Sequence, residues 1–387
     1  MQADFVIIGG GVVGSSIAYH LAAAGENSVI VIERDPSYAR ASSALSASSI
    51  RQQFTTPVSM AMSRYGFEFF RTVGDTLEVD GDRPDIGLVE RGYLYLATHG
   101  GEVRLQQALA MQHANAVPVE ALSPGALAAR YPWLNTADLA LGAYGTGGEG
   151  WFDGYSLMQA FRRKARSLGV RYLHDEAVGL TISGDRITAV ETAATGAIEG
   201  AAFVNAGGPH AARIARWAGF DLPVIPEKRT IFAFSCPECI SDMPLVVDAS
   251  GLYVRPEGEG FIAGGPVWAP EASGGDLEPD YAQFDEFTWP TLAHRIPAFE
   301  AIRMTRAWAG HYEMSLFDHN ALIGWTPGVA NLMAATGFSG HGMMHSPATG
   351  RGVAELLLHD RFETLNLTAL SIARLTSGKR IEELNVI

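Results

Sequence analysis

The stretch Asp4-Phe-Val-Ile-Ile-Gly-Gly-Gly-Val-Val-Gly14 decides the fold of this chain. Residues 4–8 form a short apolar run of the kind that predicts a buried strand. Residues 15–24 follow with helical apolar spacing and end at Gly25, which is a stop signal for a helix. Residues 28–32 predict a second strand, which ends at Glu33. The order of strand, glycine turn, helix and strand predicts a Rossmann-like unit.

Each part of this unit has a physical role in binding a dinucleotide. Gly9 permits the tight turn, Gly11 lets the backbone approach a pyrophosphate, and Gly14 lets helix and strand pack closely. The helix N-terminus offers unpaired N–H groups to the phosphates. Glu33, about 20 residues past the glycines, is placed to accept hydrogen bonds from ribose hydroxyls and disfavours NADP. The predicted contacts are Gly9, Gly11, Val12, Val13, Gly14, Glu33 and Arg34, and they do not separate FAD from NAD.

Composition limits the class of protein. The 387 residues are 47% hydrophobic, enough for a sizeable core in one or two domains. A formal charge of -14 argues against nucleic acid and anionic lipid as main partners. No apolar run approaches the ~20 residues of a membrane helix, and no basic leader precedes the first strand. We therefore expect a cytoplasmic protein.

Two cysteines, Cys236 and Cys239, stand in the sequence Cys-Pro-Glu-Cys. The spacing fits a redox dithiol or half of a zinc site, but a redox motif should open a helix after a strand. A zinc site requires two further ligands. We expect a coincidental pair in a loop and no metal site.

Further glycine-rich and small-residue segments follow along the chain. Residues 41–49 are rich in serine and alanine, and residues 203–210 read Phe-Val-Asn-Ala-Gly-Gly-Pro-His at a strand-to-helix junction. Residues 307–313 read Ala-Trp-Ala-Gly-His-Tyr-Glu, and residues 337–347 read Gly-Phe-Ser-Gly-His-Gly-Met-Met-His-Ser-Pro. A helix is predicted over 348–358, with Ser346 as N-cap and Pro347 as its first residue.

In this order, the motifs resemble the D-amino-acid oxidase superfamily, and within it the sarcosine oxidase and dimethylglycine dehydrogenase branch. They also resemble mitochondrial assembly flavoproteins related to that branch. The resemblance extends from residue 4 to about residue 358 and implies FAD as cofactor. No His or Cys lies in residues 41–51 and no Cys lies in the C-terminal block, so we expect the FAD to be non-covalent. Beyond the first unit, the implied FAD contacts are Ser42, Ser43, Ser48, Ser49, Ile50, Val178, Ala206, Gly207, Gly310, Gly340, His341, Gly342 and Met343.

The C-terminal glycine turn has a chemical purpose under this reading. A reduced flavin carries negative charge at N1 and the C2 carbonyl oxygen, and a helix N-terminus with backbone N–H groups stabilises such charge. We assign this role to Gly340, His341, Gly342 and Met343.

The expected fold is α/β (α+β), with a Rossmann-like FAD domain and a discontinuous antiparallel-sheet substrate domain. The FAD domain is expected at 1–80, 145–215 and 310–387, and the substrate domain at 81–144 and 216–309. Strands of the second sheet are predicted at 93–97, 230–234, 245–248, 251–255 and 261–263, with a helix at 281–296. The active site should lie between this sheet and the flavin.

The resemblance implies hydride transfer from the carbon beside an uncharged amine nitrogen to flavin N5, followed by hydrolysis of the imine. The substrate is expected to be a small N-substituted glycine or amino acid of the sarcosine, dimethylglycine or iminodiacetate type. The implied catalytic residues are Arg51, Tyr253, Tyr312 and His341, and the implied substrate contacts are Arg51, Tyr253, Arg255, Arg229 and Met344.

Two positions depart from the family pattern. Monomeric sarcosine oxidases place a carboxylate-binding Lys where this chain has Met344, and an oxygen-activating Lys at or near Ile262. The first departure puts sarcosine in doubt, and the second puts a fast reaction with oxygen in doubt.

Several alternatives stay open at this point. The substrate is also consistent with a primary amine, as in a D-amino-acid dehydrogenase or glycine oxidase, and a non-catalytic assembly flavoprotein is a further reading. The electron acceptor is either O2 or a redox partner. The chain acts alone, as a homo-oligomer or with a partner subunit.

Overall fold

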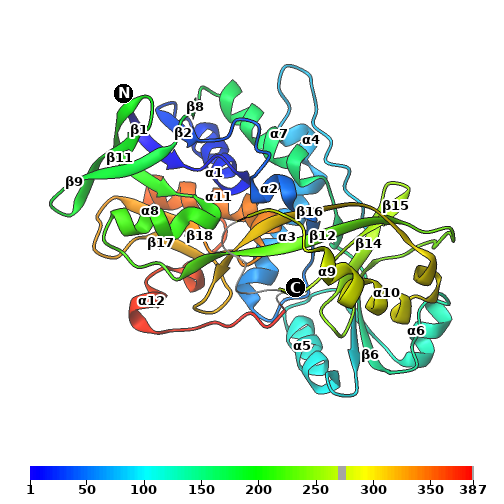
Figure 1. Cartoon of the computed structure of the whole chain (residues 1–387). Coiled ribbons are helices and arrows are strands. Elements are labelled where there is room, and N and C mark those ends of the chain that lie inside the picture. Colours follow the sequence, from blue (N-terminus) through cyan, green and yellow to red (C-terminus); the bar gives the residue numbers. More distant parts are fainter. Residues whose placement is uncertain (269–275, 386–387) are drawn as a thin grey trace.

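The computed structural model describes residues 1–268 and 276–385. Its strands form two eight-stranded sheets and one two-stranded sheet, composed of β3 (Ser49–Ile50) and β7 (Gly150–Trp151). The first large sheet lies with the N-terminal segments on one side of Figure 1, and the second lies on the other side. The expected mixed α/β class is confirmed.

The first sheet has a parallel centre, with the order β17-β18-β11-β1-β2-β8. The glycine turn therefore follows a central strand, β1, whose neighbours β11 and β2 run parallel to it. Strand β17 pairs antiparallel with β18, and β9 and β10 form an antiparallel hairpin on β11. The strands are β1 (Gln2–Ile8), β2 (Val29–Glu33), β8 (Arg171–His174), β9 (Ala177–Ser183), β10 (Arg186–Thr192), β11 (Gly196–Asn205), β17 (Leu322–Trp325) and β18 (Leu332–Thr336).

Helices cover this sheet and enclose the largest apolar cluster. The first helix, α1, packs against both α7 and α11, and α11 packs against α3. The longer helices are α1 (Val12–Ala23), α3 (Pro57–Arg71), α7 (Gly154–Ser167), α8 (Ala211–Trp217) and α11 (Gly342–His359). The shorter ones are α2 (Ser42–Leu45), α4 (Val73–Thr76) and α12 (Arg374–Ser377), with 3₁₀ turns at Gly208–His210, Pro297–Ala301 and Thr368–Leu370.

The second sheet is mixed rather than purely antiparallel. Its order is β16-β12-β15-β14-β13-β4-β6-β5, and β13 pairs with β4 in parallel, which corrects the expectation of an antiparallel sheet. The reason is topological, since a long connection separates β4 from β13 and leaves their direction free. The strands are β4 (Tyr93–Thr98), β5 (Val119–Leu122), β6 (Leu139–Gly145), β12 (Val224–Ser235), β13 (Leu245–Val247), β14 (Tyr253–Glu257), β15 (Gly260–Gly264) and β16 (Arg303–Ser315).

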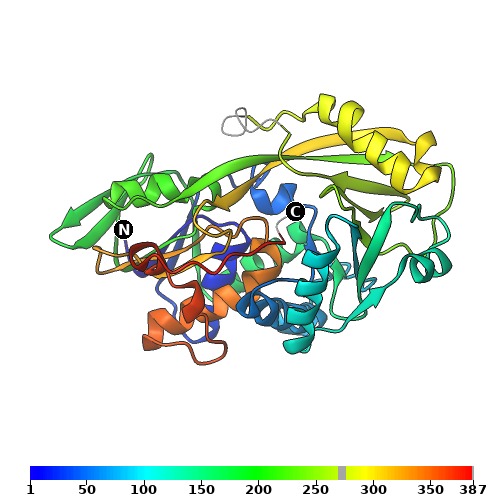
Figure 2. The ribbon, with the colours of Figure 1, turned by 90° about the horizontal axis from the view of Figure 1, so that it is seen from below.

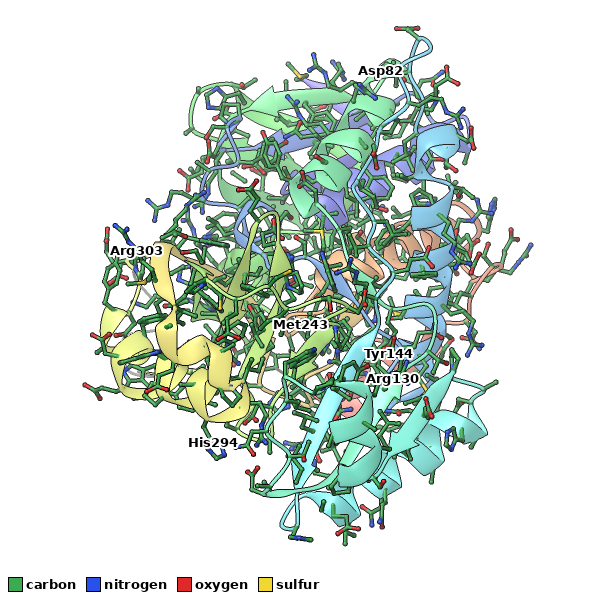
Figure 3. The ribbon with its side chains drawn as sticks, turned by 90° about the vertical axis from the view of Figure 1, so that its right-hand side faces the viewer. Asp82, Arg130, Tyr144, Met243, His294 and Arg303 are labelled. Carbon is green, nitrogen blue, oxygen red and sulfur yellow. The ribbon has the colours of Figure 1, made fainter. Side chains whose placement is uncertain are left out.

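Helices pack on the second sheet, which has an apolar core of its own that includes Leu94, Phe234, Phe261 and Phe299. They are α5 (Glu102–Ala114), α6 (Pro124–Arg130), α9 (Tyr281–Gln283) and α10 (Trp289–Arg295). The helix expected over 281–296 is present in three pieces, because Phe284–Thr288 forms a π turn between α9 and α10. At the edge of the sheet, the Arg130 guanidinium lies 4.1 Å from the centre of the Tyr144 ring (Figure 3).

Two long strands connect the halves of the molecule. Strand β12 pairs with β16 from Val224 opposite Ser315 to Ser235 opposite Arg303, with one irregularity at Ala233/Phe234. In Figures 1 and 2 this pair crosses from the side of the first sheet into the second. The expected domain boundary between residues 309 and 310 falls inside β16. The domain limits therefore stay a proposal. Residues 269–275 and 386–387, which belong to the expected domain ranges, lie outside the described residues.

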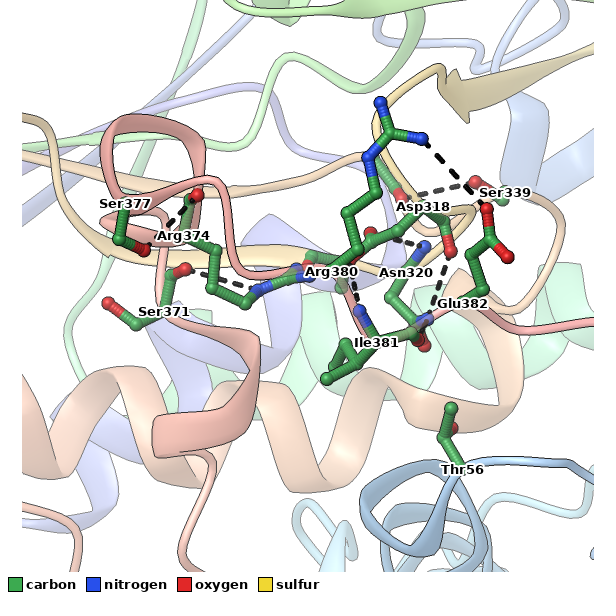
Figure 4. A network of polar contacts seen from close by, with 12 residues as sticks. Thr56, Asp318, Asn320, Ser339, Ser371, Arg374, Ser377, Arg380, Ile381 and Glu382 are labelled. Carbon is green, nitrogen blue, oxygen red and sulfur yellow. Dashed lines mark hydrogen bonds and ion pairs between the residues drawn. The ribbon is translucent and has the colours of Figure 1, made fainter.

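The C-terminal segment folds back over the first half. Arg374 donates to the carboxylate of Asp318, whose Oδ2 also accepts from the backbone N–H of Ile381 at 3.0 Å (Figure 4). Glu383 is buried and accepts hydrogen bonds from the hydroxyls of Thr55 and Thr56 at 2.8 and 3.0 Å. The end of the described chain therefore lies against the segment that follows β3.

Within residues 1–268 and 276–385, no helix combines the length and the apolar character needed to span a membrane.

Candidate functional site

One long cavity connects the glycine turn after β1 with the face of the second sheet. Its first end is lined by the turn itself, and its second end by side chains of β12, β14 and β16. Of the residues predicted for cofactor or substrate, those lining it are Gly9, Gly11, Val12, Val13, Glu33, Arg34, Ser42, Ser43, Ala206, Gly207, Arg229, Tyr253, Gly310, Tyr312, Gly340, Gly342 and Met343.

Two glycines of the turn, Gly9 and Gly14, have no room for a side chain. A Cβ on Gly9 would stand 2.3 Å from the carbonyl oxygen of Ala206, and Gly9 has a φ of +105°. A Cβ on Gly14 would stand 1.9 Å from the carbonyl oxygen of Gly9, so Gly14 supports the turn from below rather than lining the cavity. These contacts match the roles expected for the glycines of a pyrophosphate-binding turn.

Glu33 is held in place at the same end. Its Oε2 accepts from Gly10 N–H at 2.8 Å, and its Oε1 accepts from Asp35 N–H at 2.9 Å. The backbone thus fixes this carboxylate at the end of β2, where a ribose would approach.

The serine-rich segment divides into two parts. Ser43 accepts a hydrogen bond from Val12 N–H at 3.0 Å, and Ser42 donates to His311 O at 2.7 Å. Ser48, Ser49 and Ile50 are not among the residues lining the cavity. Ser49 and Ile50 form strand β3, and Ile50 is completely buried in the main core.

Strand alternation explains a further difference at β9. Ala177 lines the cavity, whereas the predicted contact Val178 is 45% exposed and absent from the lining. Successive side chains in a strand point to opposite faces, so an error of one residue moves a predicted contact to the wrong side. Asp175 and Glu176 also line the cavity, and the sequence analysis did not find them.

The helix of the C-terminal block begins one turn earlier than predicted. Helix α11 starts at Gly342 with His341 as its N-cap residue, so Ser346 and Pro347 lie inside it, which corrects their assignment as N-cap and first residue. Gly340 has a φ of +89°, and a Cβ there would stand 2.5 Å from the ring of Tyr312. The N-terminus of α11 therefore opens on the cavity through Gly340, Gly342 and Met343.

His341 does not line the cavity. Its ring is buried, and its Nε2 lies 2.9 Å from a guanidinium nitrogen of Arg51. Burial and the charge of Arg51 hold the pKa of His341 well below its usual range. The imidazole is therefore neutral at physiological pH and faces Arg51.

Three further predicted substrate contacts lie outside the cavity lining. Arg51 is 1% exposed and donates to Gln53 O at 2.5 Å and to Asn385 O. Arg255 donates to Ala47 O at 2.6 Å and pairs with Glu257. Met344 is buried in the main apolar cluster. The sequence pattern alone did not show that their side chains have partners elsewhere.

At the second end of the cavity, Arg229 lies among aromatic side chains. Its guanidinium carbon is 5.1 Å from the centre of the Tyr312 ring, and it donates to Gly265 O at 3.0 Å. Glu227 pairs with it at 2.8 Å. The Nε of Arg229 is buried and has no hydrogen-bond partner within residues 1–268 and 276–385. Burial raises the pKa values of Tyr253 and Tyr312, so both phenols keep their protons.

Glu313 lines the cavity, but its sequence motif at residues 307–313 did not predict a role for it. Its Oε2 accepts from the Thr336 hydroxyl at 2.7 Å and from Gly337 N–H at 3.0 Å. Burial raises the pKa of this carboxyl to about 7. Its position directly after Tyr312, within the motif at residues 307–313, is the signal that could have identified it.

The cysteine pair is separate from this cavity. Cys236 is a free thiol that lies 3.4 Å from Ala298 O, and Cys239 is free and exposed. Across the described ranges, no group of three or more His, Cys, Asp or Glu side chains is arranged to hold a metal.

The residues of the cavity fit a bound FAD. The turn at Gly9 and Gly11 lines the cavity with backbone alone, and the cavity extends from this turn to the second sheet. Apart from Arg229 Nε, the buried His311 Nε2 in the cavity wall also has no partner in the part of the chain that the structure describes. Such groups are expected where a polar ligand completes a site.

Comparisons with known proteins agree with this geometry. A family model described as DAO, FAD dependent oxidoreductase, matches residues 4–356. FAD-dependent oxidoreductase domain-containing protein 1 of Xenopus laevis is 39% identical over 100% of this chain and 85% of its own length. Sarcosine dehydrogenase, mitochondrial, of Mus musculus is 26% identical over 93% of this chain and 40% of its own length.

Solved structures show the same fold over nearly the whole chain. The structure of L-proline dehydrogenase from P. horikoshii has a TM-score of 0.87 and 27% identity, covering 98% of this chain and 99% of that one. Glycine oxidase from Geobacillus kaustophilus has a TM-score of 0.84 and 26% identity, covering 96% and 99%.

Proposed function

Because this chain belongs to the DAO family of FAD-dependent oxidoreductases, we propose that it oxidises the C–N bond of a small amino acid, with an N-substituted glycine as the favoured substrate. The family supplies FAD as the cofactor, and FAD accepts the hydride from the carbon beside nitrogen when it is bound. Water then hydrolyses the resulting imine to a carbonyl compound and a shorter amine or ammonia.

The observation that carries this proposal is the composition of the cavity's second end. Arg229 and the phenols of Tyr253 and Tyr312 gather there, on a cavity that begins at the glycine turn. A guanidinium with a free Nε and two protonated phenols is a donor set suited to a carboxylate. We therefore assign the substrate carboxylate to Arg229, supported by Tyr253 and Tyr312.

The same cavity supports the cofactor assignments. We propose that the pyrophosphate lies against Gly9 and Gly11, and the ribose against Glu33. The flavin end would then lie at Gly340, Gly342 and Met343, where the N-terminus of α11 stabilises negative charge on the ring. Arg51 and His341 support this end from behind, through their contact with each other.

The choice of a secondary amine is supported by two relatives. The names of sarcosine dehydrogenase and L-proline dehydrogenase both refer to secondary amines, and this chain is 26% and 27% identical to them. A primary amine is the second candidate, because glycine oxidase is 26% identical and has a TM-score of 0.84. A dicarboxylic substrate such as iminodiacetate is a further candidate on the secondary-amine branch.

The acceptor, the assembly and the compartment are parts of the same proposal. Ile262 is buried and lies at or near the position where the resemblance to monomeric sarcosine oxidases places an oxygen-activating Lys, so we favour an acceptor other than O2. Assembly with a partner subunit or as a homo-oligomer stays a prediction. The cytoplasmic location expected from the sequence stays a prediction.

The test mixes the flavin-loaded protein anaerobically with a panel of amines and follows the flavin band near about 450 nm. Bleaching by sarcosine, dimethylglycine, L-proline or iminodiacetate, but not by glycine or D-amino acids, is the expected result. Bleaching by glycine or D-amino acids alone would move the activity to primary amines. Flavin that no amine reduces would contradict the proposal and favour a non-catalytic assembly role.

A further inference from the structure

A buried acid lies between the substrate end of the cavity and the N-terminus of α11. Glu313 is on β16, directly after Tyr312, and lines the cavity. A Cβ placed on Gly342, the first residue of α11, would stand 3.4 Å from Glu313 Oε1. The acid is therefore next to the glycines that we assign to the flavin.

The two oxygens of this carboxyl differ in their surroundings. Oε2 accepts from the Thr336 hydroxyl and from Gly337 N–H. Oε1 lies on the side of Gly342, and the backbone N–H of Phe338 also donates to the carboxylate. Oε2 is thus held by β18 and the turn after it, while Oε1 faces the first residue of α11.

Other ionisable groups lie near Glu313. Those on the elements packed around it are Glu227, Lys228 and Arg229 on β12, His311 and Tyr312 on β16, His210 in the 3₁₀ turn, and His341 before α11. The pKa of His210 is lowered to about 4, and those of His311 and His341 are also lowered, chiefly by burial. Arg229 is paired with Glu227, and Lys228 with Asp276.

Glu313 is accordingly the acid whose charge changes near neutrality in this part of the cavity. Burial raises its pKa to about 7, although the hydrogen bonds from Thr336, Gly337 and Phe338 favour the ionised form. A bound cofactor would exclude more water from the carboxyl and add to the effect of burial.

We propose that Glu313 is a redox-linked proton acceptor, which takes up a proton when the adjacent flavin is reduced and gives it up when the flavin is reoxidised. Hydride transfer delivers two electrons and one proton to the flavin and leaves one negative charge on it. Glu313, ionised before the transfer, takes one further proton from solvent, so no net charge accumulates in the cavity. Reoxidation reverses both changes, with the electrons leaving to the acceptor.

This proposal rests on FAD binding and not on the identity of the amine. It is tested by chemical reduction of the flavin-loaded protein, with the midpoint potential measured against reference dyes between about pH 6 and 9. The variants are Glu313→Gln, which keeps the hydrogen-bond acceptor without the titration, and Glu176→Gln, a carboxylate lining the opposite end of the cavity.

Below pH about 7, Glu313 is protonated in both redox states, so the wild-type and Glu313→Gln potentials should run parallel. Above it, reduction draws one extra proton. The wild-type ratio of reduced to oxidised flavin should then fall tenfold per pH unit relative to Glu313→Gln, which is about 30 mV per unit for two electrons. Glu176→Gln should keep the wild-type pH dependence. If the midpoint potentials of the wild type and Glu313→Gln differ by the same amount at every pH measured, the proposal is overturned.

Thr336→Val provides an independent test if Glu313→Gln fails to hold flavin. The substitution removes a hydrogen-bond donor that favours the ionised carboxylate, so it should raise the pKa of Glu313. The pH at which the midpoint potential begins to fall more steeply should then be higher than in the wild type. An onset unchanged from wild type would also overturn the proposal.

Discussion

At the scale of single residues, Arg229 differs from the other arginines considered for the substrate. Arg51 donates to carbonyl oxygens of the protein and lies outside the cavity lining. Arg229 and Arg255 each have a buried Nε without a partner in the described ranges, but of these two side chains Arg229 is the one on the cavity wall. A buried, unpaired donor costs about 1–3 kcal/mol, so such a group is retained where a ligand completes it. The position of Arg229 on the cavity wall is therefore stronger support for a substrate contact than the sequence patterns that suggested Arg51 and Arg255.

Replacing Arg229 with methionine should weaken amine binding while leaving the flavin in place. A charge-assisted hydrogen bond contributes about 1.5–3 kcal/mol, which corresponds to a loss of about 10- to 100-fold in affinity. The dissociation constant from anaerobic flavin bleaching measures it. Arg306→Met is the matched control, because Arg306 lies on β16 but does not line the cavity. Equal affinities for the wild type and Arg229→Met would rule out the assigned role.

Gly14→Ala should abolish flavin binding, because the new methyl would stand 1.9 Å from the carbonyl oxygen of Gly9. The turn would have to move away from the pyrophosphate position. The ratio of flavin absorbance to protein absorbance after purification measures the loss, which we expect to be at least about tenfold. Gly125→Ala in α6, where a Cβ meets no atom within 4 Å, should keep its flavin. Retention of flavin by Gly14→Ala would contradict this account of the turn.

At the scale of elements, α11 shows how a proline is tolerated inside a helix. Pro347 has no N–H to donate to Met343 O, and the Ser346 hydroxyl donates to that oxygen instead, at 2.9 Å. Ser346 and Pro347 therefore interact as residues at a helix start would, but they do so about one turn inside the helix. Local patterns place helix starts poorly when a side chain replaces a missing backbone donor.

Ser346→Ala should destabilise the protein by about 1–3 kcal/mol, because Met343 O would be left buried without a donor. Denaturant unfolding measures the change. Ser377→Ala should have little effect, since Ser377 is exposed at the end of α12. If both variants unfold at the same denaturant concentration, the Ser346 hydroxyl does not have this role.

At the scale of the whole molecule, much of the architecture was predictable from the sequence. The first βαβ unit and the strands at 93–97, 230–234, 245–248 and 261–263 correspond to elements of the structure. Their signals are local: apolar periodicity, glycine stops and caps. The parallel pairing of β13 with β4 was missed, because pairing depends on contacts far apart in the chain.

The same limit applies to the candidate site. The glycines at 9, 11, 207 and 340 were found from their patterns, and they line the cavity as expected. The partners of Arg51 were not found, because Asn385 lies 334 residues away and belongs to a segment with no motif. Glu313 was missed because its raised pKa arises from burial, which no single-residue pattern reports.

The C-terminal return is expected to contribute strongly to stability. Asp318 is buried and pairs with Arg374, so Arg374→Met would leave an uncompensated charge and cost about 3–5 kcal/mol. Thermal or denaturant unfolding measures the loss. Arg380→Met provides the control, because Arg380 and Glu382 are exposed partners 3.9 Å apart and should contribute less than about 1 kcal/mol (Figure 4). Similar losses for the two variants would contradict the expected difference.

The paired strands β12 and β16 also constrain how the molecule moves. The two strands are paired from Val224/Ser315 to Ser235/Arg303, and the register shifts once, at Ala233/Phe234. If the two halves moved apart, this pair of strands would have to bend. Hinges in proteins are usually a few loop residues. Ligand entry and product release should therefore be gated by loops and side chains at the cavity mouth, with the two halves remaining as one stiff body throughout turnover.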